Sequence, residues 1–411
     1  MSTNVLLKGD DSLNIQPTES QQQLLDKVKV WYTNWQKGLS IGYHPQWFSY
    51  SGAAGVGKGV SARLIIDMLG LTDEEYIACA YVGKAVLQLR KNGMNSKTIH
   101  ALIYDAVMVN VTNEKTGKTY RRFEFELKNR LDQDYKLIFI DEAGMVNDDM
   151  VKEILSFGVP VIFMGDMNQL PPVFGFSTVL QKPDHILTQI MRQKEDDPIV
   201  QLSQMVLKGI PIFEGDYGRS KVMRSMELDK SLLTDYDQIL CNTHKYREAL
   251  NKHIRENLKH YSDHHPVIGD KVVCCQNHWE LKVGEYSLTN GMIGTITDIN
   301  RQSSYKGYYL IDFAPDFFDD GREFINLKLD KKYINLPYDQ RRLIGKINNE
   351  KFEYGYAITV YKSQGSEFDR VLYFDSFFKD IETTRRSRYT AITRAKQALT
   401  IVLNSSSNKM K

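Results

Sequence analysis

The residues best suited to chemistry in this 411-residue chain form a glycine-rich segment, Gly52–Gly59. Gly52, Gly57 and Lys58 occupy the G-x-x-x-x-G-K positions of a phosphate-binding loop. In such a loop, backbone N–H groups surround phosphate oxygens, a helix N-terminus favours negative charge, and the lysine reaches the outer phosphates. The next position normally carries a Ser or Thr that ligates Mg²⁺, but here it is Gly59. The segment therefore predicts nucleotide binding and leaves the rate of hydrolysis open.

A pair of acidic residues, Asp141 and Glu142, directly follows the apolar run 136–140. Such a run is typical of a buried strand. Carboxylates at the carboxyl end of a strand are well placed to hold Mg²⁺ and to orient a water that attacks a γ-phosphate. A second apolar run, 158–164, leads into Gly-Asp-Met-Asn-Gln-Leu-Pro-Pro-Val at 165–173. The acids therefore indicate a Mg²⁺-dependent nucleotide site at the edge of a sheet.

The elements around these residues alternate between strand and helix. Apolar runs at 47–50 and 76–82 predict strands, and a helix is expected to begin near Val60. Functional residues at the ends of alternating strands are typical of a parallel α/β sheet with ligands at its carboxyl edge. Before the first strand, Thr18 and Gln21 form a capping-box pattern that predicts a helix start. The Gln21 amide, with its donor and acceptor groups, could also face an adenine edge.

Two β-rich segments interrupt this pattern. Residues 105–128 predict a β-hairpin, because two alternating runs flank a glycine-containing turn, and Phe123 and Phe125 fall on one of its faces. Residues 262–350 contain short strand-like runs between Gly, Asn and Asp turns, which predicts a small β-barrel. We therefore expect a leader at 1–16, one α/β domain at 17–182, a second at 183–261 and 351–411, and the β-rich insertion at 262–350.

The overall charge balance predicts no partner by itself. The chain has 53 Lys and Arg against 51 Asp and Glu, a formal net charge of +2. Residues 381–411 carry seven basic residues against Glu382 alone, a local +6 that suits either a polyanion or a solvated face. The four cysteines show no C-x-x-C spacing, which disfavours zinc and disulfides. No signal segment and no long apolar window is present, so a cytoplasmic protein without a membrane partner is expected.

The ordered set of motifs is more specific than any one of them. The glycine loop, Asp141-Glu142, the 165–173 stretch and Thr-Arg-Ala-Lys at 393–396 resemble superfamily 1 helicases, specifically the RecD-like and Dda-like branch. The resemblance covers the chain from about Thr18 to Leu403, and the small size is similar to phage-encoded members, for which the location would be the host cytoplasm. It implies two RecA-like P-loop motor domains with ATP and Mg²⁺ in the cleft between them. It also implies 5′ to 3′ movement along single-stranded DNA and unwinding of duplex.

The resemblance implies roles in ATP hydrolysis for residues at the matching motif positions. Asp141 would bind Mg²⁺, Glu142 would polarise the attacking water, and Gln169 would sense the γ-phosphate. Arg192 and Arg394 would stabilise the transition state from the second motor domain, so that hydrolysis depends on closure. The residues that would contact ATP, with Gln21 at the adenine and Lys58 at the β- and γ-phosphates, are Gln21, Gly52, Ala53, Ala54, Gly55, Val56, Gly57, Lys58, Gly59, Gly365 and Glu367.

The resemblance also implies a path for single-stranded DNA. Backbone phosphates and a few stacked bases would supply affinity without reading sequence. The hairpin resembles a strand-separating pin with Phe123 or Phe125 as its tip residue, and the 262–350 insertion resembles an SH3-like barrel that helps enclose the strand. The implied partners are single-stranded DNA, its junctions with duplex, and replication or recombination proteins, with the chain acting as a monomer. The residues expected to contact DNA are Lys84, Thr98, His100, Pro172, Thr359 and Ser363.

Three motifs depart from the family pattern, at four residues in all. Tyr81-Val82 stands where Pro-Thr is usual, and Tyr361 replaces the usual His before Lys-Ser-Gln-Gly. Gly59 removes a hydroxyl that normally contacts Mg²⁺, and Ser61 would point elsewhere on the helix. Because Mg²⁺ retains several waters, a water could fill the vacant ligand position. We therefore expect weakened rather than absent hydrolysis.

Two alternatives stay open. The first keeps the fold but is a nucleotide- and single-strand-binding recombination or annealing factor with weak or no ATPase, because of Gly59. The second is an RNA-translocating helicase of the same superfamily. A kinase or another small-molecule P-loop enzyme is disfavoured, because it would not explain Gln169, Arg394 and the second α/β block together.

Overall fold

The computed structural model describes residues 16–38, 46–112, 119–172, 175–189, 197–261, 265–284, 286–300, 307–318, 320–341, 344, 347 and 349–403. The side chains of residues 111, 112, 119–123 and 279 lie outside this description. The chain divides into two compact units. The first comprises residues 1–81, 85–167 and 171–192, and the second comprises 82–84, 168–170 and 193–411.

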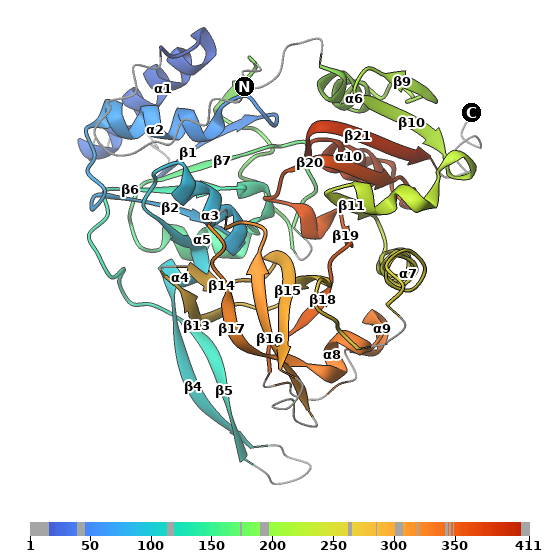
Figure 1. Ribbon diagram of the computed structural model, residues 1–411. Coiled ribbons are helices and arrows are strands. Elements are labelled where there is room, and N and C mark those ends of the chain that lie inside the picture. The colour runs from blue at the N-terminus through green and yellow to red at the C-terminus, as the bar shows by residue number, and fades with distance from the viewer. Residues whose placement is uncertain are drawn as a thin grey trace. The chain divides into compact units, whose positions relative to one another are not determined.

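The first unit is built around a parallel six-stranded sheet in the order β3-β2-β6-β7-β1-β8. Figure 1 labels its strands β2, β6, β7 and β1. Its inner strands β2, β6 and β7 are almost entirely apolar and buried, as expected for parallel strands that are covered on both faces. The prediction of a parallel α/β sheet is confirmed here. The strands are β1 (Trp47–Gly52), β2 (Tyr76–Ala80), β3 (Ser96–Thr98), β6 (Leu137–Asp141), β7 (Val161–Gly165) and β8 (His185–Leu187). The helices are α1 (Glu19–Gln36), α2 (Lys58–Leu69), α3 (Gly83–Lys91), α4 (Ile99–Ile103), α5 (Asp148–Leu155) and the 3₁₀ turn η1 (Ala143–Met145).

Helix starts in this unit follow local chemistry. Thr18 caps α1, its side chain accepts from the Gln21 N–H, and the Gln21 side chain accepts from the Thr18 N–H, so the predicted capping box is confirmed. Helix α2 begins at Lys58, earlier than the expected start near Val60, because Gly57 already adopts a left-handed cap with φ of 82°. The predicted boundary at 182/183 is also wrong. Strand β8 pairs in parallel with β1, so the first unit continues to residue 192.

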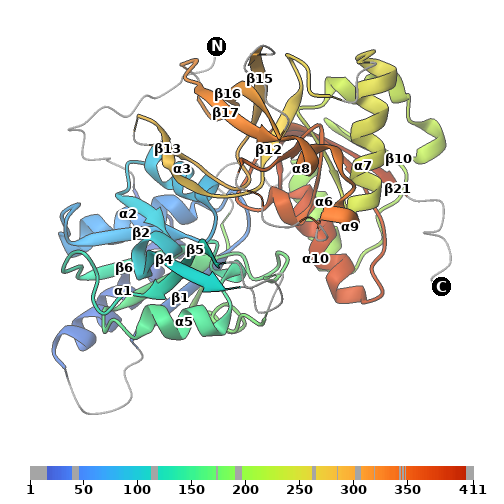
Figure 2. The ribbon, with the colours of Figure 1, turned by 90° about the horizontal axis from the view of Figure 1, so that it is seen from below.

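An antiparallel ribbon leaves the first unit. Strands β4 (Tyr104–Thr112) and β5 (Thr119–Leu127) pair from Tyr104↔Leu127 to Thr112↔Thr119, and both views show them running together (Figures 1 and 2). Phe125 pairs with Ala106 near the base, and the backbone of Phe123 pairs with Met108 in the middle. The prediction that Phe123 or Phe125 lies at the tip is therefore wrong, because the strand pairing continues beyond both residues to Thr112 and Thr119. Residues 113–118 lie outside the described part of the chain.

The second unit contains another six-stranded sheet, in the order β19-β11-β20-β21-β10-β9. All its pairings are parallel except that of β9 with β10. Its strands are β9 (Gly215–Tyr217), β10 (Ser220–Arg224), β11 (Gln238–Cys241), β19 (Ala357–Thr359), β20 (Phe368–Phe374) and β21 (Ala395–Leu403). Its helices are α6 (Pro198–Leu207), α7 (His244–His253) with a π-helical extension η4 (Ile254–Leu258), and α10 (Ile381–Ile392), with 3₁₀ turns η2 (Ser225–Glu227), η3 (Lys230–Asp235) and η5 (Tyr361–Ser363).

A five-stranded antiparallel sheet, β17-β16-β15-β12-β18, is inserted in the second unit, and Figure 2 shows β15, β16 and β17 side by side. Glu350 bonds through its backbone to both Lys328 and Asp330, which ties the chain before β18 to β17. Classification of this sheet as an SH3-like barrel stays a prediction. The elements are β12 (Lys271–Cys274), β13 (His278–Val283), β14 (Tyr286–Leu288), β15 (Ile293–Asn300), β16 (Tyr308–Pro315), β17 (Phe324–Asp330), α8 (Lys331–Asn335), α9 (Tyr338–Arg341) and β18 (Phe352–Tyr354), with β13 and β14 forming a separate hairpin.

Candidate nucleotide and nucleic-acid sites

The glycine loop after β1 has the backbone shape that phosphate binding needs. Gly55 and Gly57 have φ of 83° and 82°, a region that L side chains rarely adopt. A Cβ on Gly52 would lie 2.5 Å from a Val56 methyl carbon, so the loop can fold over β1 only with glycine there. No side chain caps the N-terminus of α2. The first N–H groups of α2 therefore face the loop without a side-chain acceptor of their own, which suits an anion.

Lys58 places its ammonium group along the loop. Its Nζ donates to the carbonyl oxygens of Gly52 at 2.8 Å and Ala53 at 3.1 Å. The buried Tyr50 hydroxyl donates to the Lys58 carbonyl at 3.1 Å, which fixes the lysine backbone against β1. Sequence reasoning missed Tyr50, because a tyrosine in an apolar run has no signal beyond packing. The loop thus holds the Lys58 ammonium against its own backbone, and contact of this group with phosphates stays a proposal.

The position after the lysine is confined by a neighbouring side chain. A Cβ on Gly59 would lie 3.2 Å from the Asn92 amide nitrogen, so a Ser or Thr there would require Asn92 to shift slightly. Ser61 does not supply the missing hydroxyl. Its Oγ is buried, donates to the Gly57 carbonyl at 3.1 Å and accepts from the Gln21 amide at 3.3 Å. The expectation that Ser61 points elsewhere is confirmed by these bonds.

The oxygen and the nitrogen of the Gln21 amide both form hydrogen bonds within the first unit. Its Oε1 accepts from the Thr18 N–H at 3.0 Å, its Nε2 donates to Ser61, and the residue is 1% exposed. The amide retains one N–H and one acceptor lone pair for an adenine edge, but both are buried. The structure therefore assigns Gln21 to helix capping and to support of the loop, while adenine recognition stays a proposal.

The acidic pair follows β6, as the apolar run predicted. Glu142 has φ of 50°, and its N–H donates to the Asp141 carboxylate at 2.8 Å. Burial, and next the nearby charge of Glu142, raise the pKa of Asp141 to about 7. A divalent cation would relieve this repulsion, so the pair fits Mg²⁺ that arrives with phosphates and waters as further ligands. Among the residues that the structure describes, no cluster of three or more His, Cys, Asp or Glu could hold a metal alone.

Close backbone packing aligns the ends of β6, β7 and β1. A Cβ on Gly165 would lie 3.1 Å from the Ala143 nitrogen, so glycine permits the turn after β6 to lie against the end of β7. The Met167 N–H donates to the Ser51 hydroxyl at 3.0 Å, which ties the segment after β7 to β1. Ser51 lies outside the sequence-predicted set. The three strand ends therefore bring the glycine loop and the acidic pair to one edge of the sheet, as expected for ligand binding.

The predicted γ-phosphate sensor belongs to the second unit. Gln169 is 6% exposed, and its Oε1 has no hydrogen-bond partner among the described residues. Arg394 is 3% exposed, and its guanidinium donates to the carbonyls of Thr390 and Ser366 and to the Thr393 hydroxyl. None of the ion pairs of the described residues involves Arg394, so this guanidinium is held without a carboxylate. Arg192 lies outside the described residues.

Gly365 and Glu367 flank the turn that holds Arg394. Gly365 has φ of 70°, which favours glycine, and Glu367 is exposed. Arg394 binds the intervening Ser366 through its carbonyl at 3.2 Å. The two predicted coupling residues and the predicted arginine therefore lie in one local structure of the second unit.

The side chains of Lys84 and Thr98 both make contacts within the protein. The Lys84 ammonium lies 4.9 Å from the centroid of the Phe368 ring, and burial lowers its pKa to about 8. The Thr98 hydroxyl caps α4 by accepting from the Ala101 N–H at 3.1 Å, and Thr98 is buried. Neither side chain is presented as a free surface group in this structure. Contact with DNA by either one stays a proposal.

His100 lies in an aromatic cluster at the base of the ribbon. Its ring centroid is 5.5 Å from Tyr81, 5.5 Å from Tyr104 and 5.9 Å from Phe125. Burial lowers the pKa of His100, which favours the neutral ring, and Phe125 is 53% exposed. Sequence analysis found His100 and Phe125 separately. It named Tyr81 only as a departure from the family pattern and did not name Tyr104, and it placed neither ring beside His100.

Thr359 and Ser363 stabilise the turn after β19. The Thr359 hydroxyl accepts from the Lys362 N–H at 3.3 Å, and the Ser363 hydroxyl donates to the Val360 carbonyl at 2.7 Å. Both residues are buried. Their hydroxyls therefore shape the segment and are not offered at its surface. Pro172 is half-buried.

The basic C-terminal segment is not the open cationic surface that one reading predicted. Arg385 and Arg386 both pair with Glu382, and Arg388 pairs with the buried carboxylate of Asp375. Lys396 pairs with Asp369 at 2.7 Å. Asp375 and Asp369, which lie outside the 381–411 segment, therefore neutralise two of its basic residues. Glu382, which is already counted in the local +6, pairs with two more. Lys409 and Lys411 lie outside the described residues.

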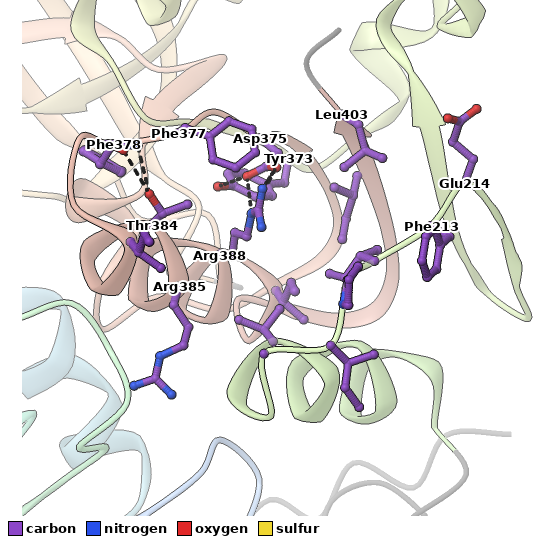
Figure 3. A pocket seen from close by; sticks show the side chains of 18 of the residues that line it. Phe213, Glu214, Tyr373, Asp375, Phe377, Phe378, Thr384, Arg385, Arg388 and Leu403 are labelled. Carbon is purple, nitrogen blue, oxygen red and sulfur yellow. Dashed lines mark hydrogen bonds and ion pairs between the residues drawn. The ribbon is translucent and has the colours of Figure 1, made fainter. Parts of the chain in front are cut away.

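A separate cavity of about 360 Å³ lies in the second unit beside α10 and β21 (Figure 3). Its walls include Phe377, Phe378 and Leu403. The polar groups within it are paired with one another, because Arg388 binds Asp375 and the Thr384 hydroxyl accepts from the Phe378 N–H (Figure 3). This arrangement supplies no reactive group.

The four cysteines are free thiols. No helix in the described part of the chain is long and apolar enough to cross a membrane.

Two family models match the chain. The AAA domain model matches residues 43–215, and the UvrD-like helicase C-terminal domain model matches residues 354–402. The chain is 24% identical to the ATP-dependent RecD2 DNA helicase of Deinococcus radiodurans over 376 residues, which cover 84% of this chain and 45% of the relative. It is 24% identical to the conjugal transfer protein TraA of Rhizobium radiobacter, over 85% of this chain and 30% of the relative. The chain thus spans less than half the length of these relatives.

Solved structures with a similar fold include two Pif1 helicases. The Bacteroides enzyme in complex with ADP-AlF3 and ssDNA has a TM-score of 0.54 and 18% identity, covering 94% of this chain and 92% of that one. The Candida albicans enzyme has a TM-score of 0.52 and 17% identity, covering 94% of each chain. At this identity the likeness concerns the fold.

Proposed function

We propose that the chain is a RecD/Pif1-like superfamily 1 helicase that hydrolyses ATP to move 5′ to 3′ along single-stranded DNA and unwind duplex. The observation that carries this proposal is the sheet edge of the first unit. There, the glycine loop, the Lys58 ammonium and the Asp141–Glu142 pair follow strands of one parallel sheet. A cation, open helix N–H groups and paired carboxylates are the components that phosphoryl transfer requires.

In this proposal, Asp141 holds Mg²⁺ and Glu142 orients the attacking water. Mg²⁺ would neutralise charge on the β- and γ-phosphates, and Lys58 would bind the same phosphates. Gln169, Arg192 and Arg394 would act on the γ-phosphate in a cleft between the two motor domains, as the family resemblance implies. The unpartnered Oε1 of Gln169 and the carboxylate-free environment of Arg394 support these roles, because both groups retain bonding capacity.

The finer parts of the proposal concern the DNA. The β4–β5 ribbon would separate strands, and the five-stranded sheet would act as the SH3-like element that encloses the strand. The exposed ring of Phe125 beside His100 supports a stacking role at the base of the ribbon. The two Pif1 structures, of which one contains ssDNA, have the same overall fold and so make a DNA substrate the first choice.

The test is unwinding of duplexes with a single-stranded 5′ or 3′ tail, with ATP and Mg²⁺, alongside ATPase assays with and without DNA. We expect DNA-stimulated hydrolysis and selective unwinding of the 5′-tailed duplex. Lys58→Ala should abolish both, and Lys91→Ala, an exposed lysine of α3, is the matched control. Turnover no greater than that of Lys58→Ala would contradict an ATPase, and selective unwinding of the 3′-tailed duplex would contradict the polarity. Stronger stimulation by RNA than by DNA would favour the RNA-translocating alternative.

Gly59 favours a second candidate, a nucleotide- and strand-binding annealing factor with little hydrolysis. The variant Gly59→Thr tests it, and the structure sharpens the design. Because Asn92 lies 3.2 Å from the new Cβ, the double variant Gly59→Thr/Asn92→Ala separates crowding from metal binding. If the missing hydroxyl limits the rate, the double variant should hydrolyse ATP about tenfold faster than Asn92→Ala alone. Equal rates would show that a water already fills the ligand position.

A further inference from the structure

A short segment after β7 is built into the second unit. The chain enters this unit at Asn168 and leaves it after Leu170. The Leu170 side chain is 1% exposed and lies in the same apolar core as Ile358, Val360 and Ile392. This core contains residues of β19, the following turn and α10. The residue next to the predicted γ-phosphate sensor is therefore an anchor and not part of a surface loop.

Three hydrogen bonds hold the backbone of this segment. The Leu170 N–H donates to the Thr390 hydroxyl at 3.0 Å, and the Leu170 carbonyl accepts from the Gln364 amide at 2.9 Å. The Gln169 carbonyl accepts from the Arg386 guanidinium at 3.1 Å. Thr390 and Gln364 are both buried, so their bonds to Leu170 are shielded from water. Side chains of α10 and of the turn after β19 thus bind the backbone N–H and carbonyl groups of this segment.

The same side chains connect to the other predicted functional groups. The Thr390 carbonyl accepts from the Arg394 guanidinium at 3.1 Å, and that guanidinium also donates to the Ser366 carbonyl. Gln364 directly follows Ser363, which is a predicted DNA contact. One continuous set of bonds therefore runs from Gln169 through Thr390 and Gln364 to Arg394 and to the turn at 361–366.

We propose that Thr390 and Gln364 are positioning residues that couple the γ-phosphate sensor at Gln169 to the nucleic-acid-binding turn at 361–366. This inference rests on the proposed function, because it assigns the coupling within that reaction. A shift of the Gln169–Leu170 peptide with nucleotide state would move the Leu170 anchor. The two hydrogen bonds transmit that shift to α10 and to the turn, which makes ATP turnover respond to the bound strand.

The alternative is that these bonds only stabilise the fold. The two roles differ in what they change. A purely structural contact would lower thermal stability, and hydrolysis would change equally with and without DNA. A coupling contact changes the ratio of the two rates. Because a buried hydrogen bond corresponds to about a five- to tenfold effect on an equilibrium, the stimulation ratio should fall by about that factor.

The experiment compares Thr390→Val with Thr390→Ser and Thr384→Val. Valine removes the hydroxyl at nearly constant volume, whereas serine retains it. Thr384 is the matched control, because it is a buried threonine of the same helix whose hydroxyl bonds to Phe378 and Asp380. We expect Thr390→Val to lower the stimulation of ATPase by oligothymidylate about five- to tenfold with KM for ATP unchanged. Thr390→Ser and Thr384→Val should keep the wild-type ratio, and Gln364→Leu should reproduce the loss.

A second measurement does not depend on turnover. Hydrogen exchange of the 359–366 amides is followed as the non-hydrolysable ATP analogue adenylyl imidodiphosphate is added with Mg²⁺. Wild-type protein should show a nucleotide-dependent change in this segment, and Thr390→Val should show a smaller one. A wild-type protein with this change but without DNA-stimulated ATPase would contradict the helicase proposal while supporting the coupling. An unchanged stimulation ratio and unchanged exchange in Thr390→Val would overturn the coupling.

Discussion

The two six-stranded sheets of this protein differ in how the helix that follows an inner strand is capped. After β1, the N-cap residue of α2 is Gly57, whose left-handed backbone provides no side-chain cap. After β11, the N-cap residue of α7 is Thr243, whose hydroxyl accepts from the Tyr246 N–H at 3.3 Å. An uncapped helix start behind a glycine loop suits an anion, whereas a self-capped start has already satisfied one of its N–H groups. This difference is why we propose that the nucleotide binds at the first sheet. The second unit is proposed to contribute side chains to the reaction.

The two units also differ in how they use charge. In the described part of the chain, the ion pairs with both side chains under 10% exposed lie in the second unit, at Arg247–Glu353, Arg341–Glu353 and Arg255–Asp270. Pairs of the first unit, such as Lys152–Asp149, have at least one exposed partner. A buried pair costs more to break than an exposed one. The second unit should therefore be more sensitive to the loss of single charges.

The largest expected effect tests the proposed contribution of the second unit to catalysis. Arg394→Ala should lower DNA-stimulated turnover about a thousandfold, because a transition-state arginine is worth at least that much in related reactions. Nucleotide binding should persist, since the loop of the first unit is intact. Steady-state ATPase and equilibrium binding of a fluorescent ADP analogue measure the two effects.

Arg385→Ala is the control for this variant. Arg385 lies on the neighbouring helix α10, but its guanidinium is paired with Glu382, so turnover should change less than twofold. Thermal denaturation of Arg394→Ala must show a folded protein, because this residue is buried. A folded Arg394→Ala enzyme with full turnover would remove the second sheet from catalysis.

The sequence predicted the first sheet well because its signals are local. A glycine loop after an apolar run and acids after another run each require only a few neighbouring residues, and the Thr18–Gln21 cap spans one turn of helix. Strand β8 was assigned to the wrong domain because His185–Leu187 is too short to have a period and is held by its pairing with β1.

The second unit was predicted less well because its functional residues depend on distant partners. Ser363 and Thr359 carry the expected residue types, but their burial follows from the turn they stabilise. The paired state of Arg388 depends on Asp375, thirteen positions earlier, on the strand-to-helix connection after β20. Phe125 was placed at a tip because its face was clear from alternation, while the hairpin register was not.

The second expected effect concerns the buried charges. Burial raises the pKa of Glu353, but the charges of Lys362, Arg247 and Arg341 outweigh it and lower the pKa to about 2. The gap from the ordinary value of 4.5 corresponds to about 3 kcal/mol of stability. Because the folded pKa is lowered, this contribution is complete above pH of about 4.5 and is lost as the pH falls toward about 2.

Glu353→Gln tests this contribution by urea unfolding across that pH range. The variant should lose about 3 kcal/mol at neutral pH, and its deficit relative to wild type should shrink as the pH falls below about 4.5. Asp149→Asn, at an exposed pair of the first unit, should cost less than about 1 kcal/mol at any pH. Equal losses of unfolding free energy in the two variants would contradict the proposal that ion pairs stabilise the second unit more than the first.

The smallest expected effect tests the opening comparison directly, by changing the cap at each strand-to-helix connection. Thr243→Ala removes the hydroxyl that caps α7 and should cost about 1 kcal/mol of unfolding free energy without changing nucleotide affinity. Gly57→Ala forces an L side chain to φ of 82°, at a cost of about 1–2 kcal/mol, and should weaken binding of the ADP analogue by at least about tenfold. The two variants have similar costs in stability, so stability alone cannot explain a difference in binding. If Thr243→Ala also weakened nucleotide binding, or Gly57→Ala left it intact, an open helix start after β1 would not be the feature that distinguishes the two sheets.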